Sequence, residues 1–170
     1  MKVAFAVLMM FGFGCSTISK KEALFDKVVS QVEICQKKKN NLDLIGSGGS
    51  IPENIEGFNL HFNVCKNVDV SQAREIAISV VEDLLSRVNS NREILQYLQP
   101  CPFTENQTDL IIAFYQPNGQ RALPPNVASV YVINGKMLYT QYEEDNIKKI
   151  PPSGETYAEA VALIKRQKSI

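Results

Sequence analysis

Apolar and polar residues alternate strictly in one stretch of the chain, residues 57–65. The alternating residues are Phe58, Asn59, Leu60, His61, Phe62, Asn63 and Val64. Successive side chains of a strand point to opposite faces, so this pattern predicts a strand with one buried face and one wetter face.

Three longer stretches repeat apolar residues at the spacing of an amphipathic helix. They are residues 20–38, the segment from Asp69 or Ser71 to Val88, and residues 156–168. An interval of three or four residues places apolar side chains on one side of a helix. Asp69 or Ser71 is expected to cap the second helix, and Thr156 with Glu159 forms a capping box that opens the last one.

The dipeptide Asn134-Gly135 joins two apolar segments and is typical of a two-residue β-hairpin. Both residues tolerate the positive φ angles of a type I′ turn. The hairpin register pairs Val130 with Tyr139, Tyr131 with Leu138, and Val132 with Met137. Residues 109–115 are continuously apolar after Asp109, which predicts a further, central strand covered on both faces.

Glycine and serine dominate the segment between the first helix and the strands. Gly46-Ser47-Gly48-Gly49-Ser50 resembles the start of a phosphate loop, but Ile51 stands where the dinucleotide motif has its third glycine and Pro52 prevents a following helix. We therefore expect a flexible linker rather than a nucleotide site.

Together these elements predict an α+β domain over residues 57–170. Its sheet is mainly antiparallel, with about four strands and with helices packed on one face. A loop or a partner is expected on the other face. A tether helix and the Gly/Ser linker, residues 15–56, precede the domain.

The N-terminus has the three regions of an export signal. Lys2 precedes an apolar run that is too short to cross a bilayer, and Gly14 stands directly before Cys15. This segment resembles the precursor of a bacterial lipoprotein, in which a cysteine after a small residue becomes the lipid-carrying first residue. That family usually has an aliphatic residue and then a small residue at the two positions before Gly14, where this chain has Gly12 and Phe13.

The resemblance implies a signal peptide over residues 1–14, a lipid on Cys15, and Ser16 as the residue that directs sorting to the outer membrane. The membrane would then be one partner of the chain, through its lipid anchor. Cleavage after Gly12-Phe13-Gly14 without lipid would instead give a periplasmic or secreted protein, and a retained segment is the third alternative. The rest of the chain is similar to small uncharacterised bacterial lipoproteins, a likeness that assigns no residue roles.

The charge of the chain is balanced, with 18 Lys and Arg against 18 Asp and Glu. This balance excludes a broad electrostatic nucleic-acid binder, which carries a basic stripe or domain. Removal of residues 1–14 takes away one cation, Lys2, and leaves a net charge of −1. Attachment to the envelope is therefore expected to come from lipid rather than from charge.

Three cysteines remain besides Cys15. Cys35 falls on the apolar side of the first helix, where we expect a small core residue. Cys65 closes one predicted strand and Cys101 lies just ahead of another. A Cys65–Cys101 disulfide is expected if those two strands are neighbours, although the sequence does not fix the pairing.

Few residues suggest catalysis or metal binding. His61 is the only histidine, which excludes two-histidine metal motifs. Cys65 would lie about 13 Å from it along the same strand, so Cys101 is the only thiol that could pair with His61 as a nucleophile–base dyad. The densest acidic cluster, Glu143-Glu144-Asp145, lacks the calcium-loop pattern and predicts a solvated turn. The sequence predicts no cofactor and no metal.

These observations favour a lipid-anchored envelope protein without enzymatic activity. Its domain is expected to bind another envelope protein or the cell wall through the sheet face. One alternative is a secreted soluble binder or inhibitor that is cleaved without lipidation. Another is a thiol enzyme that uses Cys101 with His61, or the acids near Glu143.

Overall fold

A computed structural model gives the structure of the chain and describes residues 19–143 and 146–168. Six strands form one sheet there, in the order in which they occur in the chain. The strands are β1 (Asp43–Ser50), β2 (Gly57–Cys65), β3 (Thr108–Tyr115), β4 (Ser129–Ile133), β5 (Lys136–Glu143) and β6 (Asn146–Thr156). The helices are α1 (Lys20–Asn40), α2 (Val70–Ser90), α3 (Arg92–Leu95) and α4 (Tyr157–Gln167), with a short 3-10 turn at Glu105–Gln107.

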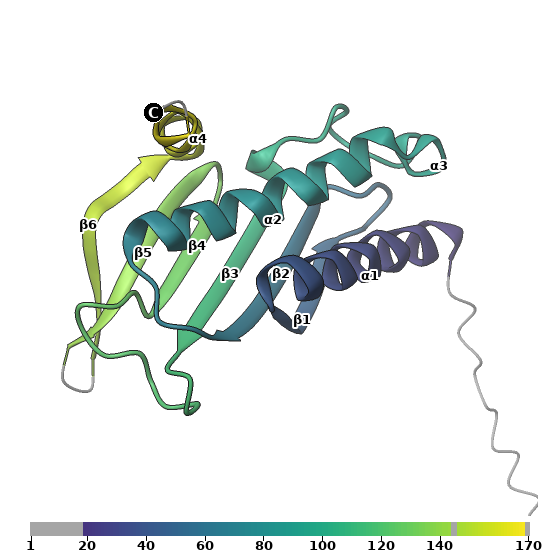
Figure 1. Cartoon of the computed structure of the whole chain (residues 1–170). Coiled ribbons are helices and arrows are strands. Elements are labelled where there is room, and N and C mark those ends of the chain that lie inside the picture. Colours follow the sequence, from purple (N-terminus) through teal and green to yellow (C-terminus); the bar gives the residue numbers. More distant parts are fainter. Residues whose placement is uncertain (1–18, 144–145, 169–170) are drawn as a thin grey trace, which may run out of the picture.

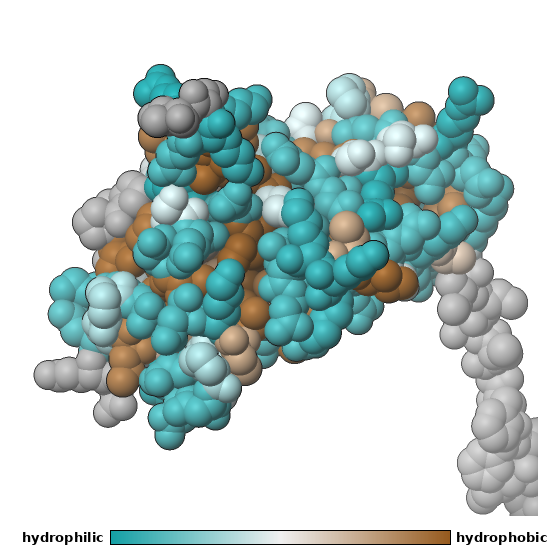
Figure 2. Space-filling view, in the orientation of Figure 1, coloured by the Kyte–Doolittle hydropathy of each residue, from teal (hydrophilic) through white to brown (hydrophobic). Residues whose placement is uncertain are grey.

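The three long helices lie on one face of the sheet (Figure 1). We call this the closed face and the opposite one the open face. Apolar residues of α1, α2 and α4 pack on the closed face in one continuous core. Hydrophilic residues cover most of the outer surface of the helices, and hydrophobic residues show mainly between the elements (Figure 2). β2 and β3 are parallel and the other neighbours antiparallel, so the expected α+β class with helices on one face is confirmed.

Capping boxes fix where the long helices begin. The side chain of Asp69 accepts a hydrogen bond from the backbone N–H of Gln72 at the start of α2. Thr156 and Glu159 do the same for α4, as expected, and Ser19 caps α1 in the same way. A capping side chain satisfies backbone donors that the first turn leaves unpaired.

The β4–β5 hairpin has the predicted turn and register. Asn134 and Gly135 have φ angles of 49° and 68°, the left-handed region that the turn requires. The paired residues are Val130 with Tyr139, Tyr131 with Leu138, and Val132 with Met137.

The Gly/Ser segment expected to be a flexible linker is the edge strand β1. It pairs antiparallel with β2 from Ser50 opposite Gly57 to Asp43 opposite Asn63, with a bulge at Ile45. α1 contributes buried residues to the common core, so the domain begins with this helix rather than at Gly57. Glycine and serine are compatible with a strand here because β2 supplies the pairing.

Two further expectations need correction. One of the strands beyond the expected four is the edge strand β6, whose sequence contains two prolines; a missing N–H is tolerated there because one side of the strand has no neighbour. Within the described residues the sheet therefore has six strands instead of about four. β3 is covered on one face only, because Ile112 is fully buried whereas Ile111 is half-buried on the open face.

A buried ion pair joins α2 to the far strands of the sheet. Arg74 Nε lies 2.7 Å from Glu155 Oε1, and the side chains are only 8% and 7% exposed. The hydroxyl of Tyr139 donates to the same carboxylate oxygen. Burial, followed by the hydrogen bond and the charge of Glu155, raises the pKa of Tyr139 far above its ordinary value. The three groups lie within the packed core and join α2, β5 and β6.

Candidate functional site

One row of residues crosses the open face from strand to strand. Cross-strand pairing places them in register, in the order Gly46, His61, Ile111, Tyr131 and Leu138. Residues directly opposite on neighbouring strands carry their side chains on the same face. The four side chains of this row are half-buried, and no helix of the described residues lies against them. The row, which we call the open-face row, is therefore mainly apolar and accessible.

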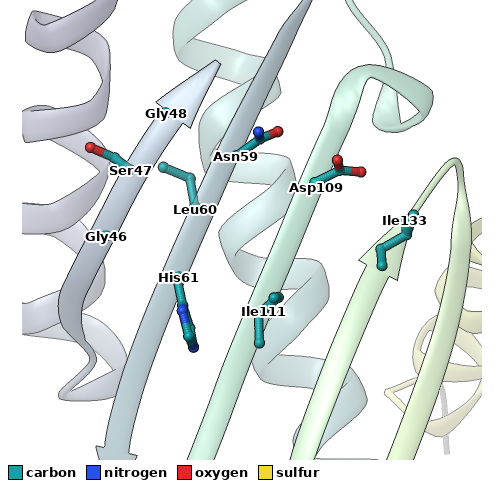
Figure 3. Close-up of a pocket in the computed structure, with 9 residues that line it drawn as sticks. All are labelled: Gly46, Ser47, Gly48, Asn59, Leu60, His61, Asp109, Ile111 and Ile133. Carbon is teal, nitrogen blue, oxygen red and sulfur yellow. The ribbon is translucent and has the colours of Figure 1, made fainter. Parts of the chain in front are cut away.

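A hollow of about 410 Å³ lies at the β1 end of this row. Figure 3 shows it from the open face, with the helices behind the sheet. Its lining residues are Gly46, Ser47, Gly48, Asn59, Leu60, His61, Asp109, Ile111 and Ile133. Glycines on β1 stand beside larger side chains on β2, β3 and β4, so the surface is lower over β1. The hollow forms because Gly46 and Gly48 carry no side chain.

The three glycines of β1, Gly46, Gly48 and Gly49, differ in how much room the fold leaves for a side chain. A Cβ at Gly49 would lie 2.4 Å from the Gly57 carbonyl oxygen and 2.6 Å from the Phe25 ring, so only glycine fits. A Cβ at Gly48 would meet nothing within 4 Å, and one at Gly46 would meet only the Cβ of His61, at 3.9 Å. Glycine inside a strand costs about 0.5–1 kcal/mol relative to alanine. Packing within the domain explains Gly49 but neither of the other two.

Polar groups at the hollow are free to meet a ligand. Asn59 and Asp109 are exposed and His61 is half-buried. The side chains of these three residues make no hydrogen bond or ion pair with any other residue that the structure describes. The hollow thus offers an amide, an imidazole and a carboxylate next to the apolar side chains of Ile111 and Ile133.

The structure does not bring the predicted thiol pairs together. Cys65 and Cys101 are free cysteines, so the expected disulfide is absent between them. Cys65 ends β2, whereas the backbone N–H of Gln99, two residues before Cys101, donates to Ile55 ahead of the start of that strand. The length of β2 corresponds to about 26 Å at roughly 3.3 Å per residue. β2 and β3 are neighbours, as the disulfide required, but they run parallel: Cys65 lies opposite Tyr115 at the end of β3, whereas Cys101 precedes the start of β3.

The remaining sequence candidates divide between described and undescribed residues. Cys35 is half-buried on α1 rather than a fully buried core residue. Glu143 pairs with Lys148 at 2.9 Å on the surface. Cys15 lies outside the described residues, as do Glu144 and Asp145.

Neither a metal site nor a membrane span is found in the part of the chain that the structure describes. Residues 19–143 and 146–168 contain no group of three or more histidine, cysteine or acidic side chains placed to hold a metal ion. No described helix combines the length and the apolar character needed to cross a bilayer.

A second depression, of about 450 Å³, lies among the helices, where the end of α1 meets α2 and α4. It is lined by charged residues of both signs, and Lys168 Nζ lies 2.8 Å from Glu75 Oε1 across it. Four lysines and two glutamates line it, and an exposed ion pair such as Lys168–Glu75 is worth at most about 1 kcal/mol. The hollow on the open face is therefore the stronger candidate for a binding site.

Comparison with known proteins adds no family or fold neighbour. No protein-family model, curated protein sequence or solved structure matches this chain.

Proposed function

We propose that this chain is a lipid-anchored envelope protein whose domain binds another envelope protein through the open face of its sheet. The observation that carries the proposal is the open-face row next to the hollow, a contiguous apolar surface that no described helix covers. Exposed apolar patches with aromatic residues and a few polar groups are typical of protein-binding surfaces.

The position of α1 bears on how such an anchor would act. Ser19 caps α1 and Lys20 begins it, so five residue steps separate Cys15 from the folded domain. A fully extended chain spans at most about 3.3–3.6 Å per residue, which limits this connection to roughly 18 Å. With no linker after α1, a lipid on Cys15 would hold the domain against the membrane surface.

A binding role also agrees with the placement of the reactive side chains. His61 lies in the middle of β2, whereas Gln99, two residues before Cys101, bonds to Ile55 ahead of the start of β2, six residues before His61 in the chain. The Arg74–Glu155 pair is enclosed in the core, where a substrate has no access. Binding of a protein partner does not require His61, Cys101 or the Arg74–Glu155 pair to react.

Metabolic labelling with a palmitate analogue tests the anchor. We expect label on the wild-type protein and none on Cys15→Ala, because the cysteine thiol and the amino group that follows cleavage are the acylation sites of a lipoprotein. Equal labelling of the two would overturn the lipid anchor. N-terminal sequencing that finds a free terminus at Cys15 or beyond would instead support the secreted soluble binder.

Site-specific photocrosslinking tests the binding face. A benzophenone amino acid at Tyr131, in the open-face row, is expected to give a discrete adduct with one envelope protein in intact cells. The same group at Lys27, which is exposed on α1, serves as the control. Absence of an adduct at Tyr131, or an identical adduct at both positions, would contradict binding through the open face.

A further inference from the structure

The two edges of the sheet differ in how well they are protected from additional strands. β6 contains two prolines, which have no backbone N–H to donate to another strand, and two lysines, of which Lys148 is paired with Glu143. β1 contains no proline, and its single charged residue, Asp43, is paired with Lys37 at 2.7 Å. The bulge at Ile45 disturbs only the first half of β1.

The second half of β1 is a regular, free edge. Gly46 to Ser50 pair residue by residue with His61 to Gly57 of β2 and have no strand on their other side among the described residues. Their outward backbone groups are therefore available to an extended chain. Strand addition of this kind draws its affinity from main-chain hydrogen bonds and its specificity from pockets for alternate side chains.

Gly46 and Gly48 supply such a pocket. They face the same side as His61 and Asn59, and the fold leaves room for a Cβ at both positions. A glycine inside a strand often marks the close approach of a ligand or of another backbone. Neither glycine has a positive φ that would explain it otherwise.

We propose that the Gly46–Ser50 edge of β1 binds an extended segment of the partner protein, with aromatic side chains at two positions, i and i+2, that lie over Gly46 and Gly48. This inference rests on the proposed function and names the class of ligand for the same face. Neighbouring strands lie about 4.8 Å apart. An aromatic ring on the added strand therefore covers the glycine beside it and reaches the side chains of β2.

The chemistry of the hollow fits this occupant. An aromatic side chain across from a glycine on the next strand restores the packing that the glycine lacks. The ring edge would meet the imidazole of His61 in one position and the amide of Asn59 in the other, and a tyrosine hydroxyl can bond to either group. Apolar Ile111 lies next in the open-face row beyond His61.

Selection from a displayed library of random ten-residue peptides on the purified full chain in detergent tests the proposal. Enriched peptides are expected to share two aromatic residues spaced two apart, without proline between them. Each should bind Gly48→Val at least tenfold more weakly than the wild type. Amide hydrogen exchange over residues 46–50 should slow when the peptide binds.

Melting temperatures and a smaller substitution control for any effect of Gly48→Val on folding. Gly48→Val is expected to melt at the same temperature as the wild type or a higher one, because its side chain enters open space in a strand. Gly48→Ala should weaken the peptides less than Gly48→Val. Binding at equal strength to Gly48→Val, enrichment without the aromatic pattern, or no enrichment at all would overturn the proposal.

Two outcomes separate this inference from the proposed function. If the Tyr131 crosslink persists unchanged in Gly48→Val, the partner binds the open face without the β1 edge, and only the inference fails. If the wild-type chain is a dimer that Gly48→Val dissociates, the edge binds a second copy and the peptide proposal is wrong. If Tyr131 gives no adduct at all, the proposed function itself fails.

Discussion

Ile111 and Ile112 are neighbours on β3 whose side chains point to opposite faces of the sheet. Ile112 is 0% exposed beneath the helices, whereas Ile111 is half-buried in the open-face row. The same contrast runs along β2, where Phe62 is buried and His61 is accessible. The closed face supplies the buried core, whereas the open face is left accessible, so we expect substitutions on the open face to cost less stability.

The largest effect is expected where the closed face holds a charge. Glu155→Gln leaves the Arg74 guanidinium buried without its counter-charge, and breaking such a pair costs about 3–5 kcal/mol. Denaturant unfolding followed by circular dichroism measures the loss. Lys148→Gln at the exposed Glu143–Lys148 pair is the control and should change stability by less than about 1 kcal/mol. Similar losses in the two variants would refute the structural role of the buried pair.

The two isoleucines of β3 provide a matched test of the faces. Ile112→Ala should lower the free energy of unfolding by about 2–5 kcal/mol, because it opens a cavity in the core. Ile111→Ala should lower it by clearly less, because that side chain is only partly buried and no described helix packs against it. The same denaturant measurement on both variants decides the matter, and equal losses would mean that the open face is also part of the core.

The glycines of β1 sharpen the comparison within a single strand. Gly49→Ala should cost about 1–3 kcal/mol, because its Cβ would collide with the Gly57 carbonyl and the Phe25 ring. Gly48→Ala should instead stabilise the domain by about 0.4–1 kcal/mol, through a less flexible unfolded chain. Thermal melting of the two variants should therefore shift in opposite directions. A loss of stability in Gly48→Ala would show that the fold itself requires glycine at this position.

The smallest effect concerns acid. The backbone N–H of Thr156, and then its hydroxyl, lower the pKa of Glu159 below its ordinary value. The unfolded chain then binds a proton more readily, so the stability that this cap provides is present above a pH of about 4.3 and is lost as the pH falls through the lowered pKa. The melting temperature of Glu159→Gln should depend less on pH between about 5 and 3 than that of the wild type. Melting temperatures that change equally with pH in Glu159→Gln and the wild type would contradict the assignment of this pH dependence to Glu159.

Local signals in the sequence were sufficient for the elements next to them. The caps at Asp69 and Thr156, the Asn134-Gly135 turn and the alternation over residues 57–65 each act within a few residues, and the structure contains all four features. Both edge strands were missed, because glycine, serine and proline are typical of loops. Their extended conformation depends on pairing with β2 and β5, which lies outside any local window.

The candidate site could be predicted only in part. An accessible sheet face and a partly exposed His61 follow from alternation, but the hollow depends on β1, whose glycines and serines are typical of a linker. One signal was present: Gly46 and Gly48 are spaced two apart, the interval of one strand face. The separation of Cys65 from Cys101 required the topology, since nothing in the sequence places residues 99–101 beside the start of β2.

The sequential order of the six strands has a consequence for how the chain folds. Each strand pairs only with those before and after it in the chain, and most of these partners are joined by short connections. The exception is the parallel β2–β3 pair, whose two strands are separated in the chain by residues 66–107. Loop closure costs more entropy as the connection lengthens, and non-local pairing slows folding. The β1–β2 and β4–β6 units are therefore expected to form early, and their joining through β3 is expected to set the folding rate.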